Sequence, residues 1–371
     1  KYNSAGGLQW WRLYGGAAEL YDVPTGILVD DTGAVYVTGA SYDNIADEAD
    51  YFTRKYDTDG NIIWSHRYDY AGYHDIPASI IFGKEGEIMV IGASGATASA
   101  WDFATLEINP LNGDVLDSNR EPGAPGWEAA IDIAQDAEGN LYVTGTDETG
   151  GTKDIKTIKL DTLLNTEWWA VWDGPAGLDD IGVGVETDLD GNIYVGGQTT
   201  KSNGAKDYVV IKYDPSGTII WERQYAALDP ALEATAKHLT IDKADKRIFI
   251  SGTVDNGDNL DIMTLMYDIN GNLLWEERYN GVANGDDKIT FLQSDRFWRF
   301  TVGGKTWNGS DFQNLLIRYD FVNHTIPLDT AAIPTSMNYF ENKGQLIDTE
   351  GNLRNDIKFY SRQHNPALYF M

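Results

Sequence analysis

The chain contains no cysteine among its 371 residues, which excludes disulfide bridges, thiol chemistry and cysteine-based metal sites. It also has few basic residues, because 28 Lys and Arg stand against 57 Asp and Glu and leave a formal net charge of −29. That charge argues against nucleic acid or an anionic membrane surface as a partner. No apolar run reaches the ~18 residues that a membrane-spanning helix needs, so the sequence predicts no membrane span.

Catalytic motifs are equally scarce. The five histidines are scattered along the chain, and no two of them stand at metal-ligand spacing. No nucleophile elbow, Walker loop or dinucleotide-binding fingerprint occurs in a fitting context. The sequence therefore predicts a protein that is not an enzyme, with no catalytic residues and no cofactor.

The chain does contain a repeat. A glycine that ends an apolar stretch and an aspartate that opens the next stretch each recur six times, at intervals of about 50–55 residues. A fixed period of this length is typical of propeller blades, whereas a β-helix needs a much shorter one. The glycines are Gly39, Gly92, Gly145, Gly197, Gly252 and Gly304, and the aspartates are Asp50, Asp102, Asp154, Asp207, Asp261 and Asp311.

Each repeat resolves into four short strands, most clearly in residues 180–225. The first strand follows an acidic residue, and the second is a nearly continuous apolar run that suits a strand buried on both faces. The third alternates, and the fourth carries a tryptophan such as Trp64 or Trp221. Turns that place Asp first and Gly fourth, as in residues 57–60, are typical of type I turns. The sequence thus predicts an all-β fold, a β-propeller of four-stranded antiparallel blades.

The repeat count favours six blades. The chain opens in mid-unit, because KYNSAGGLQWWRLY matches KYDTDGNIIWSHRY and places Trp10 where the later unit has Trp64. The last unit has a third strand at 315–319 but no tryptophan strand after it, so we expect the N-terminal strand at residues 9–14 to complete it and close the propeller. Seven blades, with further sequence supplying the rest, is the alternative. The propeller is expected over residues 1–324, with units starting near 22, 75, 128, 180, 233 and 287 and the closing strand within 1–14.

These motifs resemble the seven-bladed beta-propeller repeat (SBBP repeat) family, whose units read roughly D-x-x-G-N-x-Y-V-T-G, then D-x-x-x-x-K-Y, then G-x-x-x-W. The resemblance covers about residues 1–320. Residues 325–371 comprise a connector and an ENKGQ segment, which resembles the opening of a module that often accompanies these propellers on bacterial secreted proteins. That module usually precedes the propeller, whereas here it follows. We expect a short β-rich extension, with strands near 357–361 and 367–371, that docks on the propeller or pairs with another chain.

The resemblance implies a secreted or cell-surface protein that serves as a non-catalytic interaction or scaffold module for a protein or glycan. A carbohydrate-active propeller enzyme, of glycosidase or lyase type, and a strand-pairing subunit of a surface assembly are the alternatives. Binding should use loops on one face, where aromatic residues interrupt the repeat and can anchor a ligand; local packing over the blade ends is their other possible role. These ligand-binding candidates are Tyr70, Tyr73, His74, Trp101, Trp127 and Trp307.

An acidic residue also opens each first strand, on the same face and near the expected channel mouth. The repetition favours a structural role in capping backbone amides of a neighbouring loop. Carboxylates that converge on a channel repel one another unless they are solvated, paired or bridged by a cation such as calcium. Acids in the turns, such as Asp57 and Asp188, lack the ligand pattern of a calcium-binding loop and are expected to bond local backbone. The channel-mouth acidic ring comprises Asp22, Asp75, Glu128, Asp180, Glu233 and Asp287.

Overall fold

The computed structural model describes residues 1–3, 6–15, 22–42, 48–97, 99–121, 126–226, 231–244, 246–294 and 299–320, and the backbone of 357–362 and 365–370. All regular elements in this part of the chain are β-strands, and no helix in it has the length and hydropathy of a membrane span. The chain divides into two compact units, Lys1–Ile193 with Asp214–Thr218, and Tyr194–Tyr213 with Ile219–Met371.

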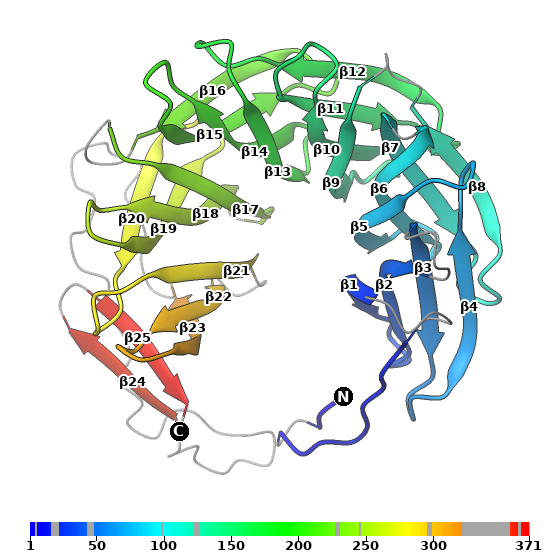
Figure 1. Ribbon diagram of the computed structural model, residues 1–371, viewed down its shortest axis with the longest axis horizontal. Coiled ribbons are helices and arrows are strands. Elements are labelled where there is room, and N and C mark those ends of the chain that lie inside the picture. The colour runs from blue at the N-terminus through cyan, green and yellow to red at the C-terminus, as the bar shows by residue number, and fades with distance from the viewer. Residues whose placement is uncertain are drawn as a thin grey trace. The chain divides into compact units, whose positions relative to one another are not determined.

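Three sheets of the first unit run in sequence order, β1-β2-β3-β4, β5-β6-β7-β8 and β9-β10-β11-β12 (Figure 1). Their strands are β1 (Asp22–Val29), β2 (Val35–Tyr42), β3 (Ala49–Tyr56), β4 (Ile62–Tyr68), β5 (Asp75–Phe82), β6 (Ile88–Thr97), β7 (Ala100–Ile108), β8 (Val115–Arg120), β9 (Glu128–Gln135), β10 (Leu141–Asp147), β11 (Asp154–Leu160) and β12 (Thr166–Trp172).

The remaining sheets have the orders β13-β14-β15-β16, β17-β18-β19-β20 and β21-β22-β23-β25-β24. Six antiparallel sheets agree with the six predicted blades. The strands are β13 (Asp180–Thr187), β14 (Ile193–Thr200), β15 (Lys206–Tyr213), β16 (Ile219–Tyr225), β17 (Ala234–Asp242), β18 (Arg247–Asp255), β19 (Leu260–Asp268), β20 (Leu273–Tyr279), β21 (Asp287–Ser294), β22 (Arg299–Trp307), β23 (Phe312–Asp320), β24 (Ile357–Arg362) and β25 (Asn365–Phe370).

The recurring glycines lie in the second strands, where the backbone of the first strand comes very close. In β10, where every residue is buried, Gly145 faces Ala130 of β9 next to a register shift between Thr144 and Gly145. A Cβ atom on Gly145 would lie 2.0 Å from the Ala129 carbonyl oxygen. The same close approach to the first strand recurs at Gly39, Gly92, Gly252 and Gly304. Only glycine lets the two backbones approach this closely.

Gly145→Ala is therefore expected to lower the free energy of unfolding by about 1–3 kcal/mol, because the new methyl group must displace backbone atoms. Urea unfolding followed by circular dichroism measures the change. Gly150→Ala is the control, since its Cβ would meet only Asp154 Oδ2, at 3.8 Å. Equal losses for both variants would contradict the close-approach explanation.

The Asp-Gly turns have the predicted local chemistry. Asp57 Oδ1 accepts the N–H groups of Asp59 at 2.9 Å and Asn61 at 2.8 Å. Gly60 donates to the Asp57 carbonyl at 3.1 Å and has a φ of 81°. The amide and N–H of Asn61 hold the pKa of Asp57 below its ordinary value. These turn carboxylates are therefore occupied by local backbone, as expected, and the pattern recurs at Asp136, Asp161, Asp188, Asp214 and Asp268.

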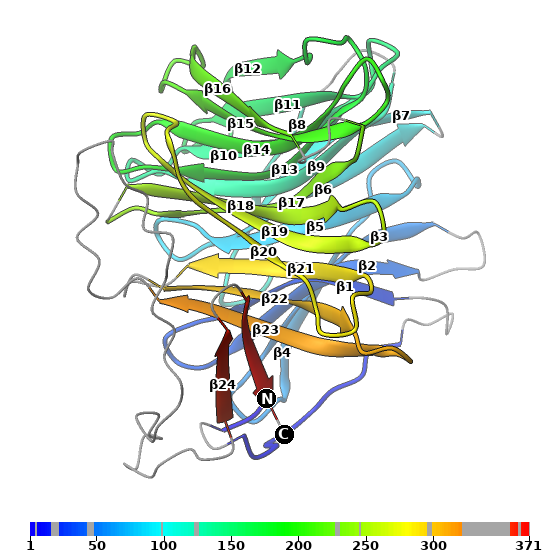
Figure 2. The same cartoon turned by 90° about the vertical axis from the view of Figure 1, so that its left-hand side faces the viewer.

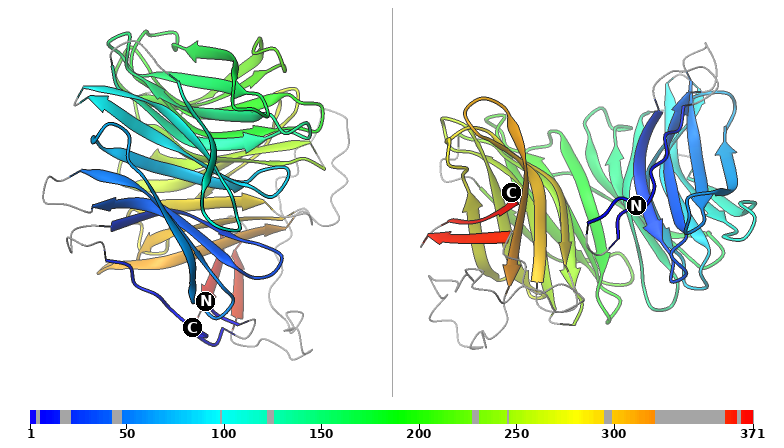
Figure 3. Two further views of the ribbon diagram at one scale, coloured as in Figure 1. Left: turned by 90° about the vertical axis from the view of Figure 1, so that its right-hand side faces the viewer. Right: turned by 90° about the horizontal axis from the view of Figure 1, so that it is seen from below.

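The repeated tryptophans tie one sheet to the next. Trp64 Nε1 donates to the Pro110 carbonyl at 3.0 Å, and its ring lies over Gly113. Trp168 and Trp221 make the same bond to Pro215 and Ile269. Trp10 does so as well, with the Thr58 carbonyl at 2.8 Å, and Figure 3 shows the N-terminal segment running beside the first sheet. The segment therefore has the contacts of a fourth strand, as its sequence predicts.

The predicted closure of the last sheet is wrong in one respect. The edge of β23 that we assigned to residues 9–14 is paired with β25, with Leu316 opposite Leu368, and β25 pairs with β24 (Figure 2). An open strand edge offers unpaired N–H and C=O groups, and in the second unit β25 meets this edge at the pair Leu316 and Leu368. The hairpin of β24 and β25 agrees with the predicted β-rich extension and its docking. The boundary at 324/325 and the ENKGQ segment lie outside the described residues.

Candidate functional site

Loops of the first unit bring together five of the six predicted aromatic residues. The ring of His74 stacks on that of Trp101, with 5.9 Å between centroids and an angle of 22°. Trp101 N–H donates to the Gly126 carbonyl at 3.0 Å, and an isolated bridge joins Trp101 to Trp127. Tyr73 lies over Gly95 at the end of β6. The aromatic patch consists of Tyr70, Tyr73, His74, Trp101 and Trp127.

Three rings of the aromatic patch are exposed, and cations contact two of them. Tyr70, Tyr73 and Trp127 are 40%, 36% and 39% exposed. The Arg120 guanidinium lies 4.4 Å from the centroid of Tyr70, and Lys153 Nζ lies 5.7 Å from that of Trp127. Such cation–π contacts orient a ring without covering both faces. The loops therefore present oriented aromatic faces to solvent.

His74 contacts both the backbone and a neighbouring ring of the patch. Its Nδ1 accepts the Ala49 N–H at 2.9 Å, so Nδ1 carries no proton in this arrangement. Its ring also contacts Tyr42 edge-on at 6.4 Å. With one nitrogen bonded to backbone and one face on Trp101, His74 is a positioning residue for the patch.

Trp307, the sixth predicted residue, lies in the second unit. Its ring packs edge-on against Phe312, with 5.3 Å between centroids and an angle of 70°. A Cβ on Gly285 would meet the same ring at 2.4 Å. Trp307 therefore has the other role considered for these aromatic residues, local packing over the end of a blade.

The acidic series holds at five of the six predicted positions. Asp22, Asp75, Glu128, Asp180 and Asp287 each open a first strand, and the last four are at most 1% exposed. Glu233 is exposed and stands one residue before β17. The matching position is Ala234, because Ala236 pairs with Gly252 as Ala130 pairs with Gly145. The prediction of Glu233 as the acid that opens this strand is therefore wrong by one residue.

Three of these acids cap backbone amides, as the sequence predicts, whereas Glu128 pairs with Lys156. Asp75 Oδ2 accepts the Tyr70 N–H at 2.6 Å, and Asp287 Oδ2 accepts the Gly281 N–H at 2.7 Å. Asp180 Oδ2 accepts the Gly174 N–H in the same way. Each donor follows a fourth strand, so the acid of one sheet fixes the loop leaving the sheet before it.

Two of these acids belong to carboxylate triads that the sequence did not reveal. One oxygen each from Asp50, Asp69 and Asp75 lie within 4.8 Å of one another, and so do those of Asp154, Asp173 and Asp180. Burial, with the charges of Asp50 and Asp69, raises the pKa of Asp75 to about 7. Burial and the charges of Asp173 and Asp180 raise the pKa of Asp154 to about 6. Oxygen clusters of this kind can hold a hard cation.

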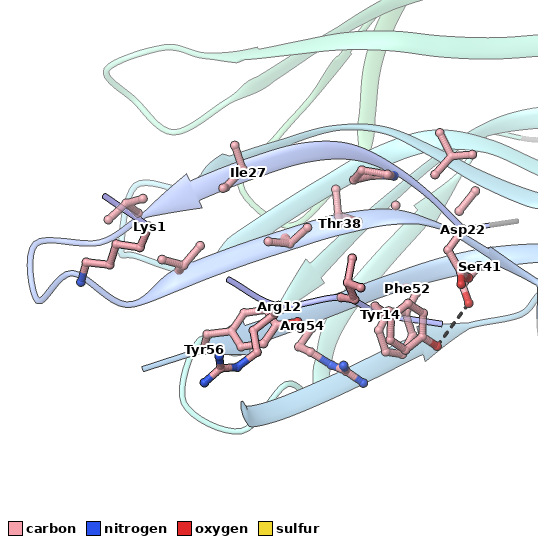
Figure 4. A pocket seen from close by; sticks show the side chains of 18 of the residues that line it. Lys1, Arg12, Tyr14, Asp22, Ile27, Thr38, Ser41, Phe52, Arg54 and Tyr56 are labelled. Atoms are coloured by element: carbon pink, nitrogen blue, oxygen red, sulfur yellow. Dashed lines mark hydrogen bonds between the residues drawn. The ribbon is translucent and has the colours of Figure 1, made fainter. Parts of the chain in front are cut away.

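A pocket of about 580 Å³ lies on the first sheet beneath the N-terminal segment (Figure 4). Its wall includes Ile27, which is 65% exposed, whereas Ile80 at the same place in β5 is 5% exposed and packs with Tyr36 and Tyr51. A preceding sheet covers this face of β5. The pocket wall therefore resembles the face of a sheet against which another sheet packs. Arg12, Tyr14 and Arg54 line its edge.

Comparison with known proteins gives the fold. No family model and no curated protein matches the chain. It is similar to the alpha-L-arabinanase of Penicillium chrysogenum complexed with arabinobiose, at 12% identity over 81% of this chain and 93% of that one, with a TM-score of 0.50. The fold is a β-propeller. At such identity the likeness extends to the fold alone, and the resemblance to SBBP repeats stays a prediction.

Two further solved structures are more distantly similar. The polysaccharide lyase Uly1 matches at 10% identity over 93% of this chain and 89% of that one, with a TM-score of 0.46. The extracellular domains 1–2 of Drosophila Semaphorin 1b match at 8% identity over 80% and 77%, with a TM-score of 0.41. Because a propeller serves many purposes, function has to be argued from the site.

Proposed function

We propose that this protein is a non-catalytic propeller, secreted or at the bacterial cell surface, that binds a protein or glycan through the aromatic patch. The observation that carries the proposal is the set of three rings, Tyr70, Tyr73 and Trp127, each more than a third exposed and held on neighbouring loops. Ordered aromatic faces on a rigid scaffold lose little conformational entropy when a ligand binds.

A neutral glycan is the ligand class that fits the patch best. Sugar rings stack their C–H groups on aromatic faces, and their hydroxyl groups need polar partners nearby. The exposed Asp69 carboxylate precedes Tyr70, and Lys153 Nζ lies 5.7 Å from the Trp127 ring centroid. The net charge of −29 disfavours an anionic polysaccharide.

The carboxylates beside the patch favour binding over cleavage. Glycoside hydrolysis uses an acid and a second carboxylate that both reach the substrate. Asp75 has a raised pKa near 7, but it is 0% exposed and its Oδ2 is bonded to the Tyr70 N–H. It is thus placed to support the loop. The likeness to an arabinanase concerns the fold and supplies no activity.

Trp127→Ala and Tyr73→Ala are each expected to weaken ligand binding by about tenfold, because aromatic anchors that a ligand covers dominate the binding energy of such sites. Stability should change by no more than about 0.5 kcal/mol, as is usual for surface positions. A glycan array with wild-type protein identifies the ligand, and titration calorimetry then compares the variants. Trp11→Ala is the matched control, since Trp11 is 62% exposed in the N-terminal segment.

Unchanged affinity in both patch variants would contradict the site assignment. Unfolding of Trp127→Ala would show that the ring is a packing residue. An array without hits, combined with capture of a specific surface protein that Trp127→Ala abolishes, would assign the patch to a protein ligand.

A further inference from the structure

One arrangement of oxygen atoms recurs at three sheet junctions. An aspartate at the start of a third strand, a residue just after the fourth strand, and the aspartate that opens the next first strand lie together. The sets are Asp50, Asp69 and Asp75; Asp154, Asp173 and Asp180; and Asp261, Asn280 and Asp287. Within each of the first two sets, oxygens lie within 4.8 Å of one another, and in the third set burial and the charge of Asp261 raise the pKa of Asp287. The first two lie in the first unit and the third in the second unit. In each set the residue after the middle member donates its N–H to Oδ2 of the last member.

At Asp75 and Asp287 this bond leaves a second buried oxygen without a partner. Asp75 and Asp287 are 0% exposed, and the Tyr70 and Gly281 N–H groups occupy only their Oδ2 atoms. Oδ1 of each is buried and makes no hydrogen bond in the described structure, although the Ser94 and Thr306 hydroxyls partly offset the rise in pKa that burial causes at Asp75 and Asp287. A buried carboxylate oxygen without a donor is costly. Something positively charged or donating is therefore needed at the junction.

The third junction also has buried oxygens that lack a hydrogen-bond donor, but its residues include an asparagine. Asp261 is 0% exposed, and its Oδ1 also has no partner among the described residues. The side-chain oxygen of Asn280 is buried and unpartnered as well, while its nitrogen donates to Asn284 Oδ1 at 2.7 Å. Two carboxylates and an amide oxygen are ligands that calcium accepts.

The two intervening junctions carry a lysine. Lys156 Nζ lies 2.8 Å from both carboxylate oxygens of Glu128, which takes the position of Asp75. At the junction between the β13–β16 sheet and the β17–β20 sheet, Ala234 replaces the first-strand acid. Lys201 Nζ there lies 2.6 Å from the third-strand Asp207. The chain thus supplies its own cation at these two junctions.

We propose that calcium ions bind at the three oxygen-lined junctions, each held by the third-strand Asp, the residue after the fourth strand, and the first-strand Asp. A hard cation with oxygen ligands suits carboxylates and an amide. The site of Asp154, Asp173 and Asp180 should bind most tightly. At the other two, Arg67 and Arg278 pair with Asp50 and Asp261, whereas Val171 occupies the corresponding position on β12.

Equilibrium dialysis of the metal-free full chain against calcium tests the proposal, in about 0.15 M salt so that diffuse attraction is screened. We expect saturable binding that Asp173→Ala reduces by one site, because alanine removes the ligand oxygen altogether, whereas asparagine would keep an amide oxygen that calcium accepts. Asp173 is exposed, so this change spares the fold. Asp31→Ala, which removes an exposed turn carboxylate, is the matched control and should bind as the wild type does.

A second variant separates cation binding from a purely structural role. Asp173→Lys places an ammonium at the junction, as Lys156 does beside Glu128. It should melt at a higher temperature than the wild type in chelator and gain less from added calcium. Absence of saturable binding would overturn the proposal. Equal loss of calcium in Asp31→Ala and Asp173→Ala would overturn it too, because it would show general attraction to an acidic surface.

Discussion

Trp64→Ala is expected to lower the free energy of unfolding by about 3–5 kcal/mol, as large aromatic truncations in a core do. Trp64 is 7% exposed, its ring lies against Gly113, and its Nε1 bonds the Pro110 carbonyl. Removing the ring opens a cavity between β4 and the turn of the next sheet. Chemical unfolding followed by near-ultraviolet circular dichroism measures the loss.

Trp169→Ala provides the comparison for this prediction. Trp169 lies in mid-strand on β12, where it is 61% exposed, and its removal should change stability by no more than about 0.5 kcal/mol. Similar losses in the two variants would mean that the repeated tryptophans do not join the sheets.

Lys156→Met is the second change with a large expected effect, a loss of about 3–5 kcal/mol at neutral pH. The Lys156 and Glu128 side chains are 6% and 1% exposed, and the ammonium contacts both carboxylate oxygens. Methionine fills similar space but leaves an unpaired buried carboxylate. Lys153→Met, at a less buried lysine of the same unit, is the control and should lose much less.

The loss should depend on pH in a defined direction. Burial raises the pKa of Glu128, an effect that Lys156 opposes. Without Lys156 the folded state binds a proton more readily than the unfolded state, so the variant should regain stability as the pH falls toward the ordinary glutamate range. Unfolding curves at several pH values test this. A loss that grows as the pH falls would contradict the role of Lys156.

The sequence was sufficient for most of the fold because its signals are local. Asp57 and Gly60 define a turn within a few residues, and Gly145 and Trp64 mark positions that recur once per sheet. Their spacing therefore gave six four-strand units without tertiary information. The aromatic patch was also foreseeable in part, since Tyr73 and Trp127 interrupt a regular repeat.

The remainder depended on contacts between distant segments. The bulge of β17 follows Ala236 as that of β9 follows Ala130, so Ala234 and not Glu233 takes the position of the opening acid. The pairing of β25 with β23 joins segments far apart in the sequence, and no local pattern predicts it. The carboxylate triads were missed for a similar reason, because Asp69 and Asp173 lie in loops that do not repeat in length.

The most direct test of the central claim is a long incubation of the protein with the glycan that it binds, followed by product analysis and a titration of the same sample. We predict saturable binding that Trp127→Ala weakens about tenfold, with the glycan recovered intact. Shortened or unsaturated glycan products that appear with wild-type protein and disappear when Asp69 or Asp75 is replaced by Asn would contradict the account and make the propeller an enzyme.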